Sequence, residues 1–185
     1  MPSPDNFART RRRPLLQGLA LCAAGALMKA PAMTSAPATP LVPAGHGTLK
    51  FLGLRIYEAR LEVDADFRAE DYAAHALALT LEYARSLEGQ LIAERSLIEM
   101  RRIGPIEADS GQRWLAFMRE AFPDVRAGDQ ICGRCDGRGR ASFLYNGQPH
   151  GEIDDPAFTR LFFGIWLHRA TSQPEMRRAL LGRFA

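Results

Sequence analysis

Residues that bind zinc are scarce in this chain. A structural zinc site needs four Cys or His ligands, usually in closely spaced pairs. The sequence has three cysteines and four scattered histidines, which are His46, His75, His150 and His168. Cys132 and Cys135 form the one close pair, and no second pair completes a site. We therefore expect neither a metal nor another cofactor.

The spacing of Cys132-Gly133-Arg134-Cys135 resembles a redox CxxC motif. Redox pairs of this kind lie at a helix start, whereas this segment is predicted to be a strand. Residues three apart in a strand point to opposite faces, which favours two separate thiols over a disulfide. One hypothesis for the whole chain is a thiol-linked interaction protein, which ranks third after the two functions given at the end of this subsection.

The sequence also lacks an apolar run long enough to span a bilayer, which takes about 20 residues. The apolar run from Pro14 to Met28 has no charged residue, is 15 residues long and follows a cluster of arginines at positions 9 and 11–13. Small residues and prolines come next. This three-part layout predicts an export signal over 1–32, a linker over 33–44 and one domain over 45–185, with no membrane span left once the leader is removed.

The segment Thr10 to Leu16 contains consecutive arginines and is similar to a twin-arginine leader. Two segments with small residues, Ala30-Pro31-Ala32 and Ala36-Pro37-Ala38, predict cleavage after Ala32 or after Ala38. The sequence does not choose between these two sites. We expect a periplasmic protein with a cleaved leader.

The part of the chain that follows the predicted leader also lacks an excess of positive charge. Residues 1–32 contain four arginines, Lys29 and Asp5, a net charge of +4, whereas the whole chain has a formal charge of +3, which leaves −1 for the remainder. Phosphate binding needs basic residues on the folded domain. We therefore expect no nucleic acid partner.

The pattern of apolar residues predicts strands that follow one another rather than alternate with helices. The expected order is a long strand over 48–63, a strand over 75–85, a helix from 87 to Gly104, a helix capped by Asp109 or Ser110 that ends at Pro123, and strands over 129–136, 140–145 and 148–153. Asn146-Gly147 suits the tight turn between the last two strands. This order favours an α+β fold with a largely antiparallel sheet that helices cover on one face.

Two capped helices are predicted at the end of the chain. Asp154 or Asp155 before Pro156 is typical of a helix start. Ser172 to Glu175 fits a capping box for the second helix. Phe158, Phe162 and Trp166 fall on one stripe of the first, and core packing is the simplest explanation for such aromatic residues.

Four segments in this order resemble the chalcone isomerase-like proteins, specifically their exported bacterial branch, over about residues 44–184. They are Lys50–Ala59, Glu99–Gly104, Phe122–Val125 with Gly128-Asp129, and Asn146-Gly147 through Phe162–Leu167. The resemblance implies an open-faced β-sandwich, in which a curved antiparallel sheet packs against helices around a hydrophobic cleft.

The resemblance does not bring the plant catalytic residues with it. Plant enzymes of this fold use an arginine before the first long strand, a threonine within it and a tyrosine to polarise a chalcone. Alignment on Ile56-Tyr57 puts Leu52 at the threonine position and Trp114 in place of the tyrosine, with no arginine in 42–48. Because one oxyanion donor is worth roughly 3–4 kcal/mol of barrier, we expect the chalcone reaction to be absent or very slow.

The leading hypothesis is therefore a non-catalytic protein that binds a hydrophobic or acyl-chain ligand in the cleft. Trp114, Phe162 and Trp166 are the predicted wall residues, with Arg55 or Thr171 as polar contacts. The alternative is an isomerase of the intramolecular lyase type acting on a non-flavonoid substrate, for which Thr171 is the candidate catalytic residue.

Further charged residues offer weaker sites. Glu94, Glu99 or Asp129 could act as an acid or base, but unpaired carboxylates are more often solvated. The pair Arg101-Arg102 could hold a ligand carboxylate at the cleft mouth, or stabilise a helix end through the helix dipole.

Overall fold

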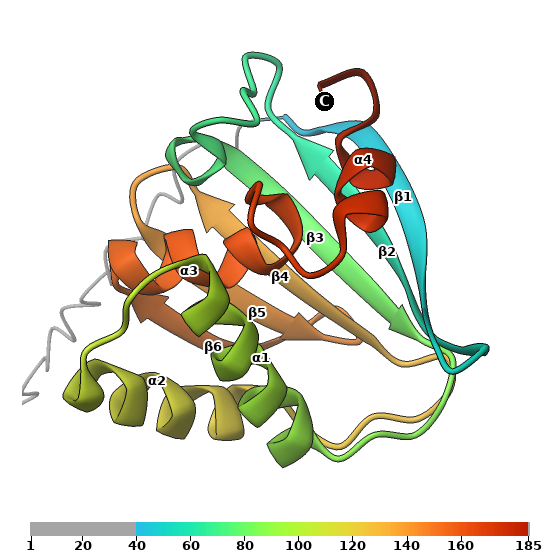
Figure 1. The fold of residues 1–185 in the computed structure, drawn as a ribbon, viewed down its shortest axis with the longest axis vertical. Helices are drawn as coiled ribbons and strands as arrows, with labels where there is room; N and C mark the ends of the chain where they lie inside the picture. The colour runs from blue at the N-terminus through green and yellow to red at the C-terminus, as the bar shows by residue number, and fades with distance from the viewer. Residues whose placement is uncertain (1–39, 185) are drawn as a thin grey trace, which may run out of the picture. The chain divides into compact units, whose positions relative to one another are not determined.

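The computed structural model describes residues 40–184, so the predicted leader and its cleavage sites lie outside the described residues. Six strands form one antiparallel sheet in the order of the sequence (Figure 1). They are β1 (Val42–Phe51), β2 (Leu54–Val63), β3 (Ala76–Tyr83), β4 (Gln130–Asp136), β5 (Arg140–Tyr145) and β6 (Gln148–Asp154). The first strand thus begins within the segment 33–44 that was predicted to be a linker.

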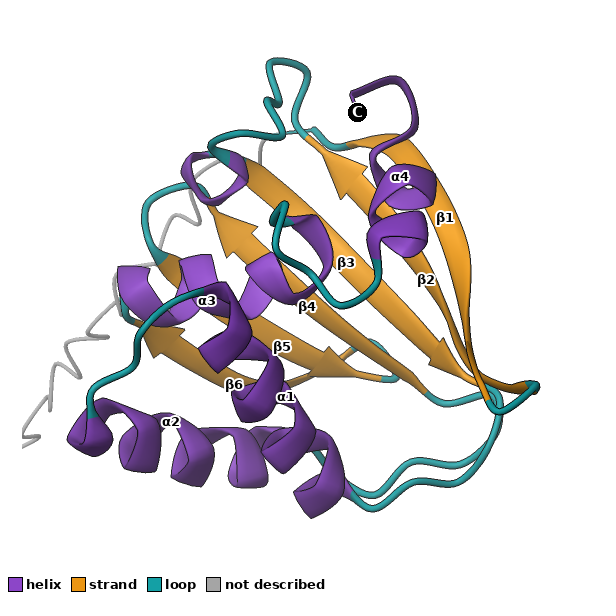
Figure 2. Cartoon of the chain, viewed as in Figure 1, coloured by secondary structure: helices purple, strands orange, loops and turns teal. Residues whose placement is uncertain are grey.

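Four helices lie over one face of this sheet (Figure 2). They are α1 (Gly89–Ile103), α2 (Ala108–Ala121), α3 (Pro156–Leu167) and α4 (Pro174–Leu181), with short 3-10 turns at η1 (Tyr72–Ala74) and η2 (Gly182–Phe184). In the described part of the chain β1 and β6 are the two edges, so the sheet is open. The fold is the predicted α+β open-faced sandwich.

The prediction of one long strand over 48–63 is wrong, because the chain reverses at Leu52-Gly53 to make the β1–β2 hairpin. Both turn residues have positive φ, 49° and 78°, nearly the values of Asn146-Gly147, 48° and 80°. Asn-Gly was recognised as a turn because both residues tolerate this region, whereas leucine rarely adopts it. Leu52 and Leu54, which a single strand would turn to one inner face, are both exposed.

Helix starts are only partly as predicted. Asp155 caps α3, its Oδ1 accepting from the backbone N–H groups of Ala157 and Phe158 at 3.0 and 3.1 Å. No side chain caps α2, which begins at Ala108 rather than after Asp109 or Ser110. The capping box at Ser172 is also wrong, because α4 follows Gln173, whose own N–H donates to Thr171 Oγ1 at 3.1 Å.

An aromatic cluster between β5 and α3 forms part of the hydrophobic core. Phe143 on β5 meets Phe162 edge to face, with ring centroids 5.0 Å apart, and Phe158 at 6.3 Å. All three side chains are buried. The predicted apolar stripe of α3 therefore faces the sheet, and it fixes where this helix lies above the strands.

Cys132 and Cys135 face opposite sides of β4, as predicted. Cys135 is buried beneath the helices, whereas Cys132 is half-buried on the other face, and both thiols are free.

Candidate functional site

A cavity of about 270 Å³ lies between the sheet and helices α1 and α3. Most of its wall is apolar, with side chains from β1, β2, β3, β4, α1 and α3. The polar residues of the wall are Tyr57, Tyr83, Arg95, Ser96, Glu99, Ser172 and Gln173. Small-molecule pockets typically measure about 300–1,000 Å³, so this cavity suits one narrow, largely apolar ligand.

The local structure of three elements creates this wall. Alternation along β3 turns Leu81 and Tyr83 toward the helices. On α1, Ile92, Ser96 and Glu99 recur at intervals of four and three, so they share the helix face that closes the cavity. Phe162 and Trp166, four residues apart on α3, complete the wall from above.

Two tyrosines place hydroxyl groups in this apolar environment. Trp166 Nε1 donates to Tyr57 Oη at 3.0 Å, and the rings of Tyr57 and Tyr83 meet edge to face with centroids 6.0 Å apart. Within residues 40–184 neither hydroxyl donates a hydrogen bond to a protein acceptor. Burial raises the pKa of Tyr57 to about 12 and raises the pKa of Tyr83 further still. Both groups are therefore neutral donors at neutral pH.

A charged pair borders the cavity on α1. Glu99 is only 5% exposed, and its Oε1 lies 2.6 Å from Arg95 Nη2, while its Oε2 accepts from Arg102 Nε at 3.3 Å. The Arg95 side chain is mostly exposed, so its cation lies at the rim while its partner carboxylate is buried. A buried carboxylate held by two arginines is a fixed element of the site rather than a free base.

The structure brings together only two of the predicted site residues. Phe162 and Trp166 line the cavity. Arg55 is exposed near the β1–β2 turn, outside the lining. Thr171 also lies outside it, because its Oγ1 donates to Ile165 O at 2.6 Å and so fixes the end of α3.

Trp114 is likewise outside the cavity. Its Nε1 donates to Asp155 Oδ2 at 2.8 Å, and its ring packs against Phe158. The indole thus supports the residue that caps α3. Leu52, aligned with the catalytic threonine of plant enzymes, lies in the exposed turn, and the hairpin residues that line the cavity are Leu49, Ile56 and Tyr57.

Sequence reasoning missed the polar half of the site. Tyr57 and Tyr83 were predicted only to lie in strands. Glu99 was considered as an acid or base, but its arginine partners were not predicted. Of the two roles considered for Arg101-Arg102, ligand binding at the cleft mouth or a basic helix end, the structure shows the second, because both residues lie in the last turn of α1 and neither lines the cavity, whereas Arg95 does. The available signal was the spacing of Arg95 and Glu99, four apart on α1, which permits an ion pair.

Other carboxylates have structural partners. Glu94 pairs with Arg119 at 2.7 Å. Asp129 accepts from Asn146 Nδ2, Arg126 N and Tyr145 Oη at 2.7–3.0 Å, and these hydrogen bonds hold the pKa of Asp129 below its usual value. Asp129 therefore organises turns and is a poor general base.

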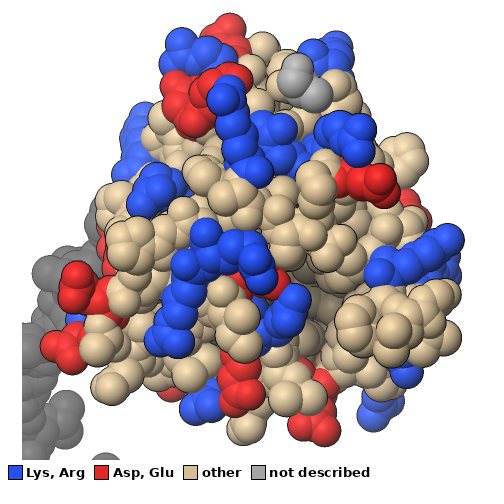
Figure 3. All heavy atoms as spheres, in the orientation of Figure 1, with Lys and Arg blue, Asp and Glu red and all other residues tan. Residues whose placement is uncertain are grey.

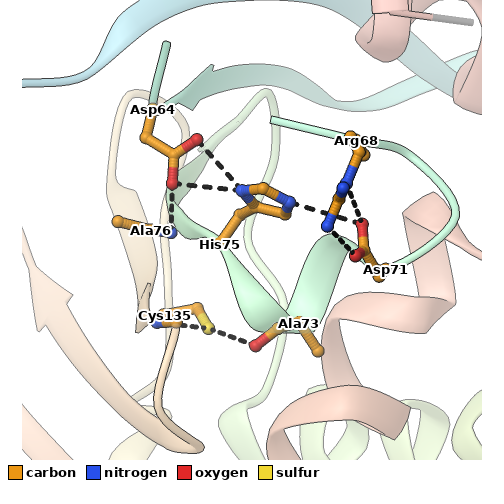
Figure 4. Close-up of polar contacts among 8 residues, drawn as sticks. Asp64, Arg68, Asp71, Ala73, His75, Ala76 and Cys135 are labelled. Atoms are coloured by element: carbon orange, nitrogen blue, oxygen red, sulfur yellow. Dashed lines mark hydrogen bonds and ion pairs between the residues drawn. The ribbon is translucent and has the colours of Figure 1, made fainter. Parts of the chain in front are cut away.

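A second polar cluster joins the end of β2 to the start of β3 (Figure 4). The ring of His75 lies between two carboxylates, with Nδ1 3.1 Å from Asp64 Oδ1 and Nε2 3.3 Å from Asp71 Oδ1. The Cys135 thiol, also drawn there, donates to Ala73 O at 3.6 Å, and burial raises its pKa to about 11. A thiol with that pKa is not a nucleophile near pH 7.

Over 40–184, no group of three or more His, Cys, Asp and Glu side chains is arranged to hold a metal ion. No helix in the same range is both long and apolar enough to cross a bilayer.

The fold and the cavity define a class of protein, an open-faced α+β domain that encloses an apolar cavity between sheet and helices. The sequence matches the chalcone isomerase-like family over residues 26–182, and the chain belongs to that family. Among solved structures it is similar to a fatty-acid binding protein of Arabidopsis thaliana, with a TM-score of 0.61 and 13% identity over 80% of this chain and 91% of that one. No curated protein matches significantly.

Proposed function

We propose that this protein binds one hydrophobic or acyl-chain ligand in the cavity between its sheet and helices, without transforming it. The observation that carries the proposal is an apolar cavity of about 270 Å³ whose wall includes two neutral tyrosines, and neither hydroxyl donates to an acceptor among residues 40–184. An unpaired polar group in an apolar site costs free energy, which a ligand oxygen can recover. The structurally similar Arabidopsis protein is a fatty-acid binding protein, which supports the same ligand class.

The geometry suggests how such a ligand lies. Each buried methylene contributes about 0.8 kcal/mol, so the apolar walls supply the affinity for a chain. The hydroxyls of Tyr57 and Tyr83 can donate to a carboxyl or carbonyl oxygen. Arg95 at the rim supplies a cation for an anionic head group, in competition with Glu99.

The first test is native mass spectrometry of the protein purified from its natural compartment, followed by solvent extraction of whatever leaves it on unfolding. We expect a discrete extra mass that matches a fatty acid or a related lipid. An empty protein that also fails to bind saturated fatty acids of graded length would contradict the proposal.

The two tryptophans provide an internal control for a binding titration. Trp166 lines the cavity and Trp114 does not. We expect fatty acid to change the fluorescence of the wild type and of Trp114→Phe, whereas Trp166→Phe loses most of the change. A signal that follows Trp114 instead would place the ligand elsewhere.

An isomerase acting on a non-flavonoid substrate is the second candidate. It is favoured by the same two phenols, because a neutral donor can polarise a carbonyl group in a water-poor cavity. The test is turnover of small enones followed by ultraviolet absorption. Activity that Tyr57→Phe and Tyr83→Phe both remove would support it, and activity unchanged in both would reject it.

We also propose export to the periplasm, which rests on the arginine pair and the uncharged run of residues 1–32. The double variant Arg11→Lys/Arg12→Lys should accumulate inside the cell if a twin-arginine route is used. Arg9→Lys, outside the pair, is the matched control. Export that is equal in all three proteins would contradict a twin-arginine leader.

A further inference from the structure

The β1–β2 hairpin ends in an exposed apolar tip, which we define as Phe51 to Leu54. Its side chains are 66% (Phe51), 86% (Leu52) and 55% (Leu54) exposed. Single exposed apolar residues are common, but three together at the end of a hairpin form a surface that favours contact with another apolar phase.

The backbone conformation of this tip is unfavourable for the residue that adopts it. Leu52 has φ 49°, a left-handed conformation that costs a leucine roughly 1–2 kcal/mol, whereas asparagine tolerates it. At the equivalent place in the β5–β6 hairpin the chain uses Asn146, with φ 48°. The first hairpin therefore gives up stability to keep a large apolar side chain at the turn. Strain of this kind points to a function.

Two cations lie at the base of the tip. Lys50 and Arg55 are directly opposite each other in the β1–β2 register, and both are exposed. Like charges in this position repel each other. Neither side chain forms an ion pair with any residue in 40–184. An apolar tip followed by unpaired cations matches the order of an acyl layer followed by anionic head groups.

The tip is continuous with the rim of the cavity. Leu49 and Ile56, the residues that flank Lys50 and Arg55 on the two strands, both line the cavity. Leu91 on α1, which is 55% exposed, lines it as well. Figure 3 shows uncharged surface around the β1–β2 turn, a hollow between it and α1, and basic side chains nearby.

We propose that this hairpin tip docks on an anionic lipid bilayer, with Phe51, Leu52 and Leu54 inserted among the acyl chains and Lys50 and Arg55 on the phosphate head groups. Docking in this way turns the cavity rim toward the bilayer. The proposal concerns the surface alone, so it can hold or fail whether or not the cavity takes an acyl chain.

The test is sedimentation of the full chain with vesicles of phosphatidylcholine, with and without one third phosphatidylglycerol. All variants are compared with the same N-terminal processing, so they differ only at the substituted residues. We expect the wild type to prefer the anionic vesicles. Lys50→Gln/Arg55→Gln should bind them about thirtyfold more weakly and with less dependence on salt. The control Arg138→Gln removes a cation at the β4–β5 turn, at the opposite end of the sheet, and should bind like the wild type.

Leu52→Asn separates docking from folding. Asparagine suits the positive φ of this turn, so the variant should unfold at a higher temperature than the wild type, yet bind anionic vesicles about tenfold more weakly. Binding equal to that of the wild type would overturn the proposal. Self-association of the wild type without vesicles, lost in Leu52→Asn, would also overturn it and assign the tip to a second copy of the chain.

Discussion

At the scale of single residues, Tyr57 links burial to charge state. The side chain is half-buried in the cavity wall, its hydroxyl accepts from Trp166, and desolvation is the main reason that its pKa is raised to about 12. Because the unfolded chain releases this proton near pH 10 and the folded chain holds it to about 12, the stability contributed by the neutral phenol is complete below pH 10 and lost as the pH rises toward 12.

This difference makes a pH prediction. One tyrosine shifted from 10 to about 12 lowers the free energy of unfolding by about 1 kcal/mol at pH 11 relative to pH 9. We expect Tyr57→Phe to lose less stability than the wild type between these values, measured by urea unfolding at each pH. A loss equal to that of the wild type would show that Tyr57 titrates normally.

Trp114 shows why residue type alone does not predict a ligand site. Trp114 and Trp166 were both predicted as wall residues, Trp166 from the apolar stripe of α3 and Trp114 because alignment puts it in place of the plant tyrosine, although it too lies on an apolar helical stripe. Only the fold determines which stripe faces the cavity, and the Trp114 stripe meets the first turn of α3 instead. Arg95 was missed because a charged residue on a helix is expected on the solvated side. In α1 the solvated side adjoins the side that borders the cavity, and Arg95 lies at the rim between them.

Trp114→Phe should therefore affect stability and not binding. Loss of the hydrogen bond to Asp155 leaves the cap in place, and we expect a cost of about 1 kcal/mol in the free energy of unfolding. Fatty-acid affinity, measured by calorimetry, should stay within about twofold of the wild type. A tenfold weaker affinity would return Trp114 to the ligand site.

At the scale of elements, the two hairpins show which turns a local sequence pattern can predict and which it cannot. The β5–β6 turn was predicted because Asn146-Gly147 is a strong turn sequence. The β1–β2 turn has the same conformation, but Leu52 concealed it within a run of β-forming residues. A sequence pattern reports the local preference of each residue, so it misses a turn that the rest of the fold imposes against preference.

The crossing of α1 and α3 depends on a single glycine. A Cβ added to Gly164 would lie 2.6 Å from Tyr72 Oη and 2.9 Å from Ile103 Cγ2. Tyr72 Oη donates to Arg160 O at 2.8 Å, so it has little freedom to move away. We expect Gly164→Ala to lower the free energy of unfolding by about 1–3 kcal/mol, measured by chemical denaturation.

A double-mutant cycle gives the control for this contact. Tyr72→Phe removes the hydroxyl that the new methyl group meets, so Gly164→Ala should cost less in the Tyr72→Phe background. Additive effects would show that the hydroxyl of Tyr72 does not limit the space beside Gly164.

At the scale of the whole molecule, the sheet-and-helix order could be predicted, whereas the cavity could not. Runs of strands and helices are local patterns, and their order was enough to indicate an α+β fold. The cavity wall takes residues from Leu49 to Gln173 on six elements and adjoining loops. Its volume depends on how far α1 and α3 stand from the sheet, a distance that no local pattern encodes.

Filling the cavity tests whether ligand binding belongs to this space. Ser96 is buried on α1, lines the cavity and donates only to Ile92 O, its own helix backbone, at 2.8 Å. Ser96→Leu places a larger apolar side chain in the cavity and frees no second polar partner. Its melting temperature without ligand should be at least that of the wild type.

Ligand at a hundred times its dissociation constant stabilises a folded protein by about 2.7 kcal/mol. We expect a saturating fatty acid to raise the melting temperature of the wild type but not that of Ser96→Leu. Gln90→Leu adds the same side chain at an exposed position of α1, outside the cavity lining, and should respond like the wild type. Equal stabilisation of all three proteins would mean that the fatty acid binds outside the cavity, because only in Ser96→Leu is that space occupied.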